Sequence, residues 1–284
     1  MTTSRRRAGA LGALLGLVLT ALAGCGSDAP SAPEPTPVPG AATNGRMTIG
    51  IAFDEPGIGV KNGDTYTGFD VETATYVAKA LGVPEANITW VEATGSKREE
   101  LLASGGADMI VSTFTITEER KQKVDFAGPY FLAHQDLLVR RNETEITGPE
   151  TLNGKDLCTV PGTTSAQNVL RFYQGRINLK ELPRYSDCVQ ALANSEVDAV
   201  TTDDVILAGY AADPQYQGRL KVIGRGFSDE SYGIGVRKGN TALKDQINAA
   251  LQQYVAAGAW EAALNRNVAP SGYNIPSPPT PGAA

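Results

Sequence analysis

Arg120 follows a run of hydroxyl side chains and stands one turn into a short predicted helix. Thr113 and Thr115 come just before it, Thr117 is a favoured helix N-cap, and the two glutamates after Thr117 suit the positive end of a helix dipole. A guanidinium there can bind a carboxylate through two parallel hydrogen bonds, while the hydroxyls and backbone amides upstream add donors and acceptors. These residue types predict a binding site for an α-amino acid. The alternative is a solvated helix start, in which Arg120 pairs with one of the glutamates.

Two further polar groups stand at the ends of predicted strands. Thr163, Thr164 and Ser165 follow one strand and begin a helix, whose free N–H groups favour an anion. Asp203 ends the next strand and offers a carboxylate to an ammonium group. Each group alone is also typical of an ordinary helix cap. Together with Arg120 they indicate a binding site, because ligands of α/β proteins bind at strand ends.

The elements that must position these residues alternate between strands and helices, as hydrophobic periodicity predicts. The first unit has strands at 47–52, 88–91 and 107–111 and helices at 69–81 and 97–103. A similar unit starts after strand 135–140, with strands at 157–160, 197–202 and 220–223 and helices at 166–173 and 187–194. Strand 232–237 and the amphipathic helix 242–257 come last. The pattern indicates an α/β fold with parallel strands covered by helices.

Two such units predict two lobes joined by a hinge. If the last strand and helix return to the first unit, lobe 1 comprises residues 46–139 and 231–270, and lobe 2 comprises residues 140–230. The crossovers near Arg140 and Phe227 then form the hinge, and the ligand binds in the cleft between the lobes.

The N-terminus has the features of an export signal. Three arginines precede a short apolar run, and small residues lead to Cys25, so residues 1–24 are predicted to be a cleaved signal peptide. The sequence Leu-Ala-Gly-Cys resembles the bacterial lipobox, which implies a lipid anchor on Cys25. Residues 25–45 are rich in proline and small residues, which predicts a flexible tether, and the tail 271–284 is expected to be disordered.

Charge and cysteine content exclude several classes of protein. Removal of the three signal-peptide arginines leaves 22 basic and 31 acidic side chains, a charge of −9, with no basic cluster for nucleic acid. Cys158 and Cys188 remain as a pair, and a disulfide is the default in an exported protein. His134 is the single histidine, so no metal or cofactor site is expected. It fits a surface or strand-edge position better than a Cys-His catalytic pair.

A set of motifs carries a family resemblance over nearly all of residues 46–269. In chain order they are Gly68-Phe69-Asp70-Val71, Arg98 to Leu102 with Ser104-Gly105 and Asp108, Thr115 to Arg120, Val124-Asp125-Phe126 with Pro129-Tyr130, Gly162 to Ser165, and Val197 to Val200 with Asp203. The set resembles the family-3 extracellular solute-binding proteins of polar amino-acid ABC importers. Asp54 to Gly59 and the pair Cys158 and Cys188 are further similar to the actinobacterial glutamate-binding lipoprotein branch.

The resemblance implies a two-lobed, periplasmic-binding-protein-like clamp on the outer face of the cell membrane that delivers an amino acid to a permease. Arg120 would hold the ligand α-carboxylate with help from Thr115 and the backbone of Thr164, and Asp203 would take the ammonium near Thr113. Arg98 would reach a side-chain carboxylate, although it is also typical of a surface arginine that pairs with a neighbouring acid.

Two positions near the first strand concern the ligand side chain. Lys61 is a second candidate for a side-chain carboxylate. The loop Glu55 to Gly59 departs from many relatives, which place an aromatic residue there over the ligand, so no aromatic lid is expected.

The implied ligand is glutamate, followed by aspartate, glutamine and asparagine, and the implied state is a monomer. Two alternatives stay open: an amino-acid sensor for a membrane signalling partner, and an enzyme similar to the cyclohexadienyl dehydratases that share this fold. The absence of a Ser-His-Asp set or a phosphate-binding loop in the sequence speaks against the enzyme.

Overall fold

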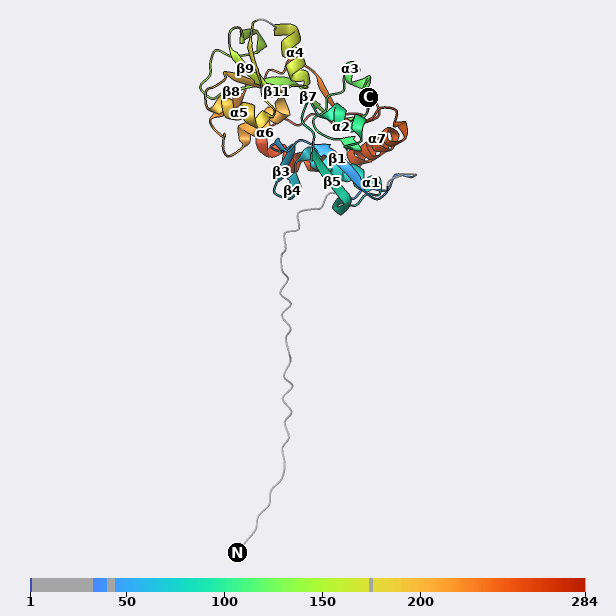
Figure 1. Ribbon diagram of the computed structural model, residues 1–284. Coiled ribbons are helices and arrows are strands. Elements are labelled where there is room, and N and C mark those ends of the chain that lie inside the picture. Colours follow the sequence, from blue (N-terminus) through green and yellow to red (C-terminus); the bar gives the residue numbers. More distant parts are fainter. Residues whose placement is uncertain (2–32, 40–43, 174–175, 284) are drawn as a thin grey trace. The chain divides into compact units, whose positions relative to one another are not determined.

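Within the described residues, which are Met1, 33–39, 44–173 and 176–283, the computed structural model contains two five-stranded sheets and a three-stranded one (Figure 1). The first sheet has the order β5-β1-β6-β13-β7 and consists of β1 (Met47–Ile51), β5 (Ile88–Glu92), β6 (Met109–Ile110), β7 (Val124–Ala133) and β13 (Glu230–Arg237). β5, β1 and β6 are parallel, whereas β13 is antiparallel to both β6 and β7. This sheet and the elements packed on it are called lobe 1.

The second sheet is the framework of lobe 2. Its order is β10-β9-β11-β8-β12, and it consists of β8 (Gln135–Arg140), β9 (Asp156–Thr159), β10 (Asn178–Glu181), β11 (Ala199–Asp203) and β12 (Leu220–Val222). β9 is parallel to β10 and β11, and β8 is antiparallel to β11 and β12. The small sheet extends lobe 1 with β2 (Asp54–Glu55), β3 (Gly59–Asn62) and β4 (Thr65–Thr67). The predicted two-lobed α/β fold is confirmed.

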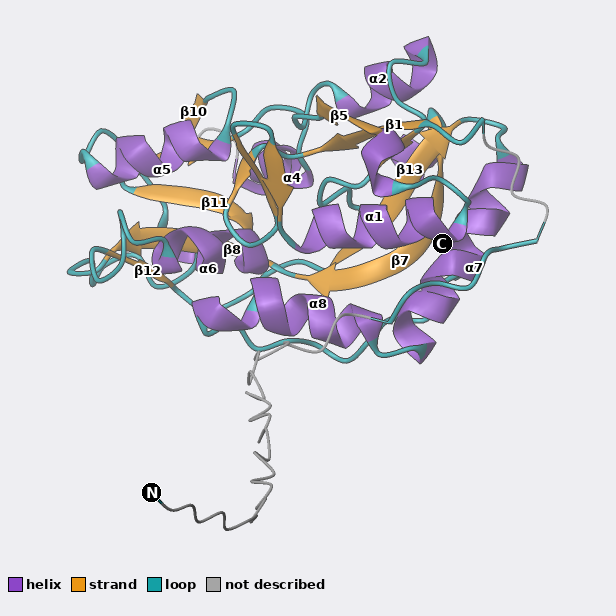
Figure 2. Cartoon of the chain, turned by 90° about the horizontal axis from the view of Figure 1, so that it is seen from below, coloured by secondary structure: helices purple, strands orange, loops and turns teal. Residues whose placement is uncertain are grey.

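Helices cover both sheets. Lobe 1 carries α1 (Phe69–Ala80), α2 (Arg98–Ser104), α3 (Glu118–Lys121), α7 (Thr241–Ala256) and α8 (Ala259–Asn267), with 3₁₀ turns at Glu85–Asn87 and Ala269–Ser271. Lobe 2 carries α4 (Thr164–Tyr173), α5 (Tyr185–Ala193) and α6 (Asp204–Ala212), with a 3₁₀ turn at Pro149–Thr151. Figure 2 shows α1, α7 and α8 gathered near β7, and all three helices contact one another.

Apolar strands buried on both faces form the core of each lobe. Ile49 in β1 and Met109 in β6 are fully buried under the helices of lobe 1. In lobe 2, Leu137, Leu138 and Val139 are consecutive and all buried, as expected for a strand between two layers of helix. Continuous apolar runs of this kind explain why the sequence predicts the strands well without revealing which sheet each one joins.

The chain crosses between the lobes twice. A single residue, His134, separates β7 in lobe 1 from β8 in lobe 2, and residues 223–229 lead from β12 back to β13. The predicted lobe boundary at 139/140 is therefore displaced by one strand, because β8 pairs with β11 in lobe 2. The return of the chain to lobe 1 through β13 agrees with the expectation.

Both termini of the folded part pack more closely than the sequence predicts. Val38, inside the predicted tether, is buried and donates its N–H to the Ala80 carbonyl at 2.8 Å. The predicted disordered tail is wrong for residues 271–283, which make hydrogen bonds with both lobes. Tyr273 donates its hydroxyl to Asp204 Oδ1 at 3.0 Å, and Gly282 donates its N–H to the Gly128 carbonyl at 2.8 Å. The predicted signal peptide and Cys25 lie outside the described residues.

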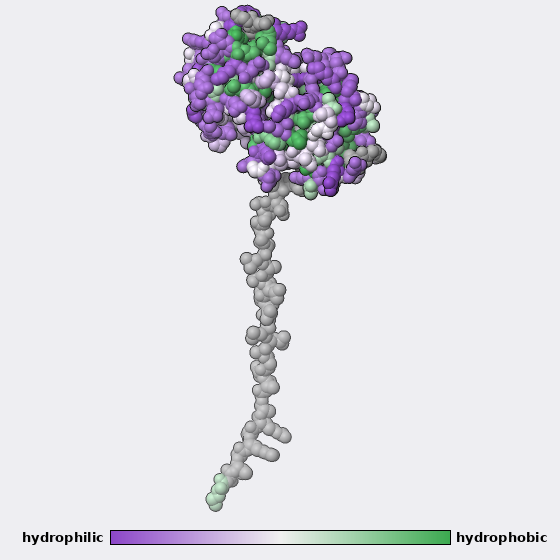
Figure 3. Space-filling model, in the orientation of Figure 1, coloured by the Kyte–Doolittle hydropathy of each residue, from purple (hydrophilic) through white to green (hydrophobic). Residues whose placement is uncertain are grey.

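The disulfide predicted between Cys158 and Cys188 is present and ties β9 to α5. Among the described residues, no helix combines the length and apolar character needed to cross a membrane. The face of the folded part seen in Figure 3 is predominantly hydrophilic with small apolar areas.

Candidate functional site

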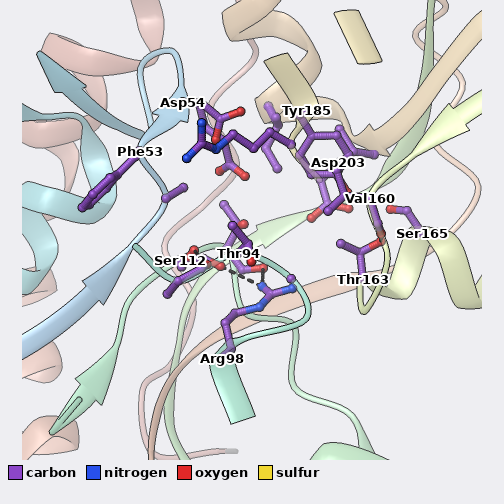
Figure 4. A pocket seen from close by; sticks show the side chains of 18 of the residues that line it. Phe53, Asp54, Thr94, Arg98, Ser112, Val160, Thr163, Ser165, Tyr185 and Asp203 are labelled. Carbon is purple, nitrogen blue, oxygen red and sulfur yellow. Dashed lines mark hydrogen bonds between the residues drawn. The ribbon is translucent and has the colours of Figure 1, made fainter. Parts of the chain in front are cut away.

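A pocket lies where strand ends of the two lobes meet. Its walls come from the segments after β1, β5 and β6 in lobe 1, and from those after β9 and within β11 in lobe 2. Its cavity volume is about 30 Å³, so the pocket is narrow in this arrangement of the lobes. Figure 4 shows residues of lobe 1, among them Phe53, Arg98 and Ser112, opposite Tyr185 and Asp203 of lobe 2.

Arg98 is the buried cation on the lobe 1 wall. It is only 4% exposed, and its Nη1 donates to the carbonyls of Ser112 and Thr113 at 2.8 and 3.2 Å. Its guanidinium carbon lies 4.7 Å from the centre of the Phe114 ring. Burial lowers the pKa of Arg98, and its Nε has no hydrogen-bond partner. An anionic ligand would supply the missing acceptor.

Arg120 lies beside the pocket rather than on its wall. Its Nη1 donates to the Thr115 carbonyl at 2.7 Å, and its Nη2 donates across the cleft to the Gly162 carbonyl at 3.0 Å. Burial, and next the repulsion from Arg98, lower the pKa of Arg120 to about 9. The predicted helix start is confirmed, because the Thr117 hydroxyl accepts a hydrogen bond from the Arg120 N–H. The structure thus brings two cations together around Phe114.

Asp203 presents an unmatched carboxylate oxygen from lobe 2. The Tyr232 hydroxyl donates to its Oδ2 at 2.6 Å, while Oδ1 is buried without a hydrogen-bond partner. Burial raises the pKa of Asp203, and repulsion from Glu230 adds to the shift. Because the side chain lines the pocket, a ligand with an N–H donor would satisfy Oδ1.

The hydroxyl residues at the start of α4 also line the pocket, as do Thr113 and Ser112 of lobe 1. Thr163 caps the helix, since its hydroxyl accepts from the Ala166 N–H at 3.1 Å. The Thr164 hydroxyl donates to Glu230 Oε2 at 2.8 Å, and Ser165 is buried behind it. The N-terminus of α4 therefore adds partial positive charge to the pocket.

Lys61 is exposed on β3 and does not line the pocket. Its Nζ lies 5.1 Å from the centre of the Phe53 ring and 5.7 Å from that of Tyr66. The structure therefore separates this sequence candidate from Arg98, Thr113, Thr164, Ser165 and Asp203, which it brings together.

Sequence reasoning missed several pocket residues. Phe53 lies between β1 and β2 and lines the pocket, just before the loop Glu55 to Gly59, which carries no aromatic residue. Tyr185 and Arg184 at the start of α5 line the opposite wall, and Glu55 lines the wall of lobe 1. An aromatic residue at the end of a predicted strand was the available signal for Phe53. Tyr185 lay at the start of a predicted helix without any motif to mark it.

Direct contacts hold the two lobes together around the pocket. Asp54 of lobe 1 accepts the Ser186 N–H of α5 at 3.0 Å, and the Tyr210 hydroxyl donates to the Asp54 carbonyl at 2.6 Å. Arg184 Nη2 lies 2.6 Å from Glu92 Oε1, which forms an ion pair across the cleft. The structure is therefore a closed arrangement of the lobes.

The pocket offers an unmatched donor on Arg98 and an unmatched acceptor on Asp203, within a wall rich in hydroxyls and backbone N–H groups. A zwitterion carries the complementary pair, a carboxylate and an ammonium. In the part of the chain that the structure describes, no cluster of three or more His, Cys, Asp or Glu side chains could hold a metal ion.

Comparisons with known proteins agree with this geometry. The model of the bacterial extracellular solute-binding proteins, family 3, matches residues 47–269. The glutamate-binding protein GluB of Corynebacterium glutamicum is 41% identical to this chain over 239 residues, which cover 80% of each of the two chains. The ABC transporter glutamine-binding protein GlnH of Bacillus subtilis is 36% identical over 77% of this chain and 79% of its own chain.

A solved structure gives the same result at the level of the fold. An ancestral arginine-binding protein bound to glutamine superposes with a TM-score of 0.73 and 33% identity, over 80% of this chain and 99% of its own. With the family model spanning both lobes and the pocket between them, the chain belongs to the bacterial extracellular solute-binding proteins of family 3.

Proposed function

We propose that the protein is the substrate-binding lipoprotein of an ABC importer and that it captures glutamate, with aspartate, glutamine and asparagine as weaker ligands. Family membership supports an amino-acid ligand and a partner permease. The 41% identity to a glutamate-binding protein supports glutamate, and the glutamine-binding relative supports the amide as the next ligand.

The observation that carries the proposal is the unmatched pair on opposite walls of the pocket. Arg98 Nε in lobe 1 and Asp203 Oδ1 in lobe 2 are both buried without a partner. A buried donor or acceptor that stays unpaired costs about 1–3 kcal/mol, and more when the group is charged. An acidic amino acid between the lobes removes both costs, because its side-chain carboxylate pairs with Arg98 and its ammonium pairs with Asp203.

Within this proposal each polar group has a role. Arg120 holds the α-carboxylate together with Thr115 and the N-terminal amides of α4, because its Nη2 already reaches Gly162 in the loop before that helix. Arg98 takes the side-chain carboxylate and Asp203 takes the ammonium.

Closure follows from the cost of unpaired charge. In an open form water solvates Arg98 and Asp203, and closing without ligand leaves both groups desolvated and incompletely paired. A ligand that pairs with them binds the closed form more tightly than the open form, so it shifts the population toward closure. Two closed lobes then present one surface to the permease.

The location belongs to the same proposal. A signal peptide over residues 1–24 and a lipid on Cys25 would hold a monomer at the extracytoplasmic face of the membrane, next to its permease. The proline-rich composition of residues 26–39 suits the spacer that such an anchor needs.

Isothermal titration calorimetry with the four amino acids tests the ligand and the roles. Arg120→Ala is expected to weaken all four by at least 100-fold, since an uncompensated buried charge costs about 3–5 kcal/mol. Arg98→Ala is expected to weaken glutamate and aspartate more than the amides. Lys61→Ala serves as a matched control outside the pocket and is expected to leave every affinity within twofold.

Failure to bind any of the four amino acids would overturn the proposed ligand class. Equal losses for acids and amides in Arg98→Ala would remove the side-chain role of that residue. Incubation with each ligand followed by chromatography separates binding from turnover and so tests the enzyme alternative, and identification of the membrane partner separates an importer from a sensor.

A further inference from the structure

Glu55 is a buried carboxylate on the pocket wall that the roles above leave without a function. It is the second residue of β2, is only 5% exposed and lines the pocket. Its Oε2 is buried without a hydrogen-bond partner. A carboxylate oxygen in this position needs a donor, and the cost of leaving it unpaired is largest where water is excluded.

The groups around Glu55 do not supply that donor. Its charged neighbours are Asp54 beside it, Asp70 of α1, Arg98 of α2 and Asp203 of β11, so three carboxyl groups face it and one cation. Arg98 Nη1 is already bonded to the carbonyls of Ser112 and Thr113. Four tyrosines also lie close enough for Glu55 to raise their pKa: Tyr130, Tyr185, Tyr210 and Tyr232.

Three of those four tyrosine hydroxyls donate to other groups. Tyr130 donates to Asp70 at 2.8 Å, Tyr232 donates to Asp203 at 2.6 Å, and Tyr210 donates to the Asp54 carbonyl. Burial is the main cause that raises the pKa of Glu55, and repulsion from Asp54 adds to the shift, while Arg98 opposes it. Because no donor within the described residues bonds to Glu55 Oε2 in this closed arrangement, a ligand can supply one.

The position of Glu55 relative to Asp203 identifies the kind of donor. The two residues come from opposite lobes, line the same pocket, sense each other's charge, and each has one unmatched carboxylate oxygen. An ammonium group has three N–H bonds that point in different directions, so it can bridge two carboxylates. Arg184, the second guanidinium on the wall, already pairs with Glu92.

We propose that Glu55 is a second receptor for the α-ammonium group of the ligand, which lies between the Glu55 and Asp203 carboxylates, one from each lobe. The inference rests on the proposed function and extends it to a residue of the loop in which many relatives carry an aromatic residue. It makes the ammonium itself a bridge between the lobes, so that ligands without an α-amino group lose the contact that draws the lobes together.

Glu55→Gln tests this assignment, because it keeps the size of the side chain and removes its charge. The α-ammonium is common to all amino acids. The variant is therefore expected to weaken glutamate and glutamine by the same factor, at least tenfold, with the ratio of their dissociation constants within twofold of wild type. The midpoint of thermal unfolding without ligand is expected to stay or rise, since an unpaired buried acid is removed.

Two further variants keep the test decisive. Glu99→Gln changes a surface glutamate of α2 that pairs with Lys123, and it is expected to leave both affinities within twofold. Should Glu55→Gln fail to fold, Glu55→Asp keeps the charge but shortens the side chain, so its oxygens lie farther from the ligand. The same equal loss of affinity for glutamate and glutamine is expected from it.

A change of more than threefold in the glutamate-to-glutamine ratio would overturn the proposal in favour of a contact with the ligand side chain. Unchanged affinities for both amino acids would show that Glu55 does not touch the ligand. If the wild-type protein binds neither amino acid, the proposed function itself fails and this inference fails with it, an outcome that the wild-type titration alone identifies.

Discussion

Lobe 1 and lobe 2 contribute to the pocket in different ways. In lobe 1, partners of the same lobe fix Arg98, through the Ser112 and Thr113 carbonyls, and Asp70, through the Thr113 N–H and the Tyr130 hydroxyl, whereas Arg120 also donates across the cleft to Gly162. In lobe 2 the corresponding groups bond across the cleft, as Asp203 does to Tyr232 and Thr164 to Glu230, both on β13 of lobe 1.

The difference indicates an order of events. The hydrogen bonds that hold Arg98 in lobe 1 do not depend on closure, so this half-site can receive the ligand first. The half-site of lobe 2 gains its partners only when the lobes meet. Ligand affinity should then respond to changes in lobe 2 through closure, and to changes in lobe 1 through the first encounter.

The largest expected effect comes from Asp203→Asn in lobe 2. An amide in place of the carboxylate removes the counter-charge that lobe 2 offers the ligand ammonium, so the affinity for glutamate should fall by at least 100-fold, about 3–5 kcal/mol. Calorimetry measures the loss. Asp187→Asn, an exposed aspartate of α5, is the control and should bind normally. A similar affinity for both variants would contradict the role of Asp203.

Loss of the Cys158–Cys188 bond should affect lobe 2 selectively. The bond closes a loop with a sequence separation of 30, so its removal by a Cys158→Ala/Cys188→Ala exchange is expected to lower the free energy of unfolding by about 3–4 kcal/mol. Hydrogen exchange should show faster opening of β9 and α5 with β1 and β6 unchanged. Equal acceleration in both lobes would mean that they do not open independently.

Stability should depend on pH through Asp70 in lobe 1. Burial raises the pKa of Asp70 from 3.8 to about 7, although the Tyr130 and Thr113 hydrogen bonds oppose the shift. Between these values the folded protein keeps a proton that the unfolded chain releases, so the free energy of unfolding falls as pH rises from about 4 to about 7. The expected fall is about 2–4 kcal/mol, given about 1.4 kcal/mol per unit.

Chemical denaturation at pH 5 and pH 7 measures this fall. Asp70→Asn removes one of the buried titrating carboxyl groups and should reduce the slope over the same range, while Glu55 and Asp203, whose pKa values are also raised, keep part of it. If the variant shows the slope of the wild type, another carboxyl group is responsible.

The smallest expected effect concerns the surface where the lobes touch. A Cβ on Gly95 of lobe 1 would lie 2.8 Å from the Pro161 carbonyl oxygen of lobe 2, so Gly95→Ala should hinder closure and weaken glutamate about tenfold, roughly 1.4 kcal/mol. Gly209→Ala in lobe 2, whose Cβ would lie 2.1 Å from the Pro56 carbonyl oxygen, should act in the same direction. Tight binding by both variants would show that the closed form tolerates more space between the lobes.

The sequence was informative wherever a pattern is local. The Thr117 cap, the amphipathic α7 and the strands that end at Asp203 and before Ser112 all follow from residues close to one another in the chain. Sheet membership is not local, which explains the displaced lobe boundary: the apolar strand β8 fits either sheet, and its partner β11 is some 60 residues away.

The sequence predicts which residues belong to the candidate site but not where each side chain lies in it. The motifs and the family resemblance placed Arg98, Arg120 and Asp203 in one site. Only the fold shows that Arg98 lines the pocket wall, whereas Arg120 donates one of its hydrogen bonds to the Gly162 carbonyl. Glu55 was passed over because a carboxylate in a glycine-rich loop is ordinary on a surface. Its burial depends on lobe 2, which packs against that loop.

The single residue between β7 and β8 has a mechanical consequence. His134 leaves no slack between the two sheets, and Phe227 of the second crossing donates its N–H to the Gln135 carbonyl alongside it. The two lobes therefore rotate about a short hinge. A small change in the backbone torsion angles at His134 produces a large displacement at the ends of the lobes far from that hinge. A pair of fluorophores on the β3–β4 turn and on β10 would read that displacement and turn the protein into a reagentless sensor for its ligand.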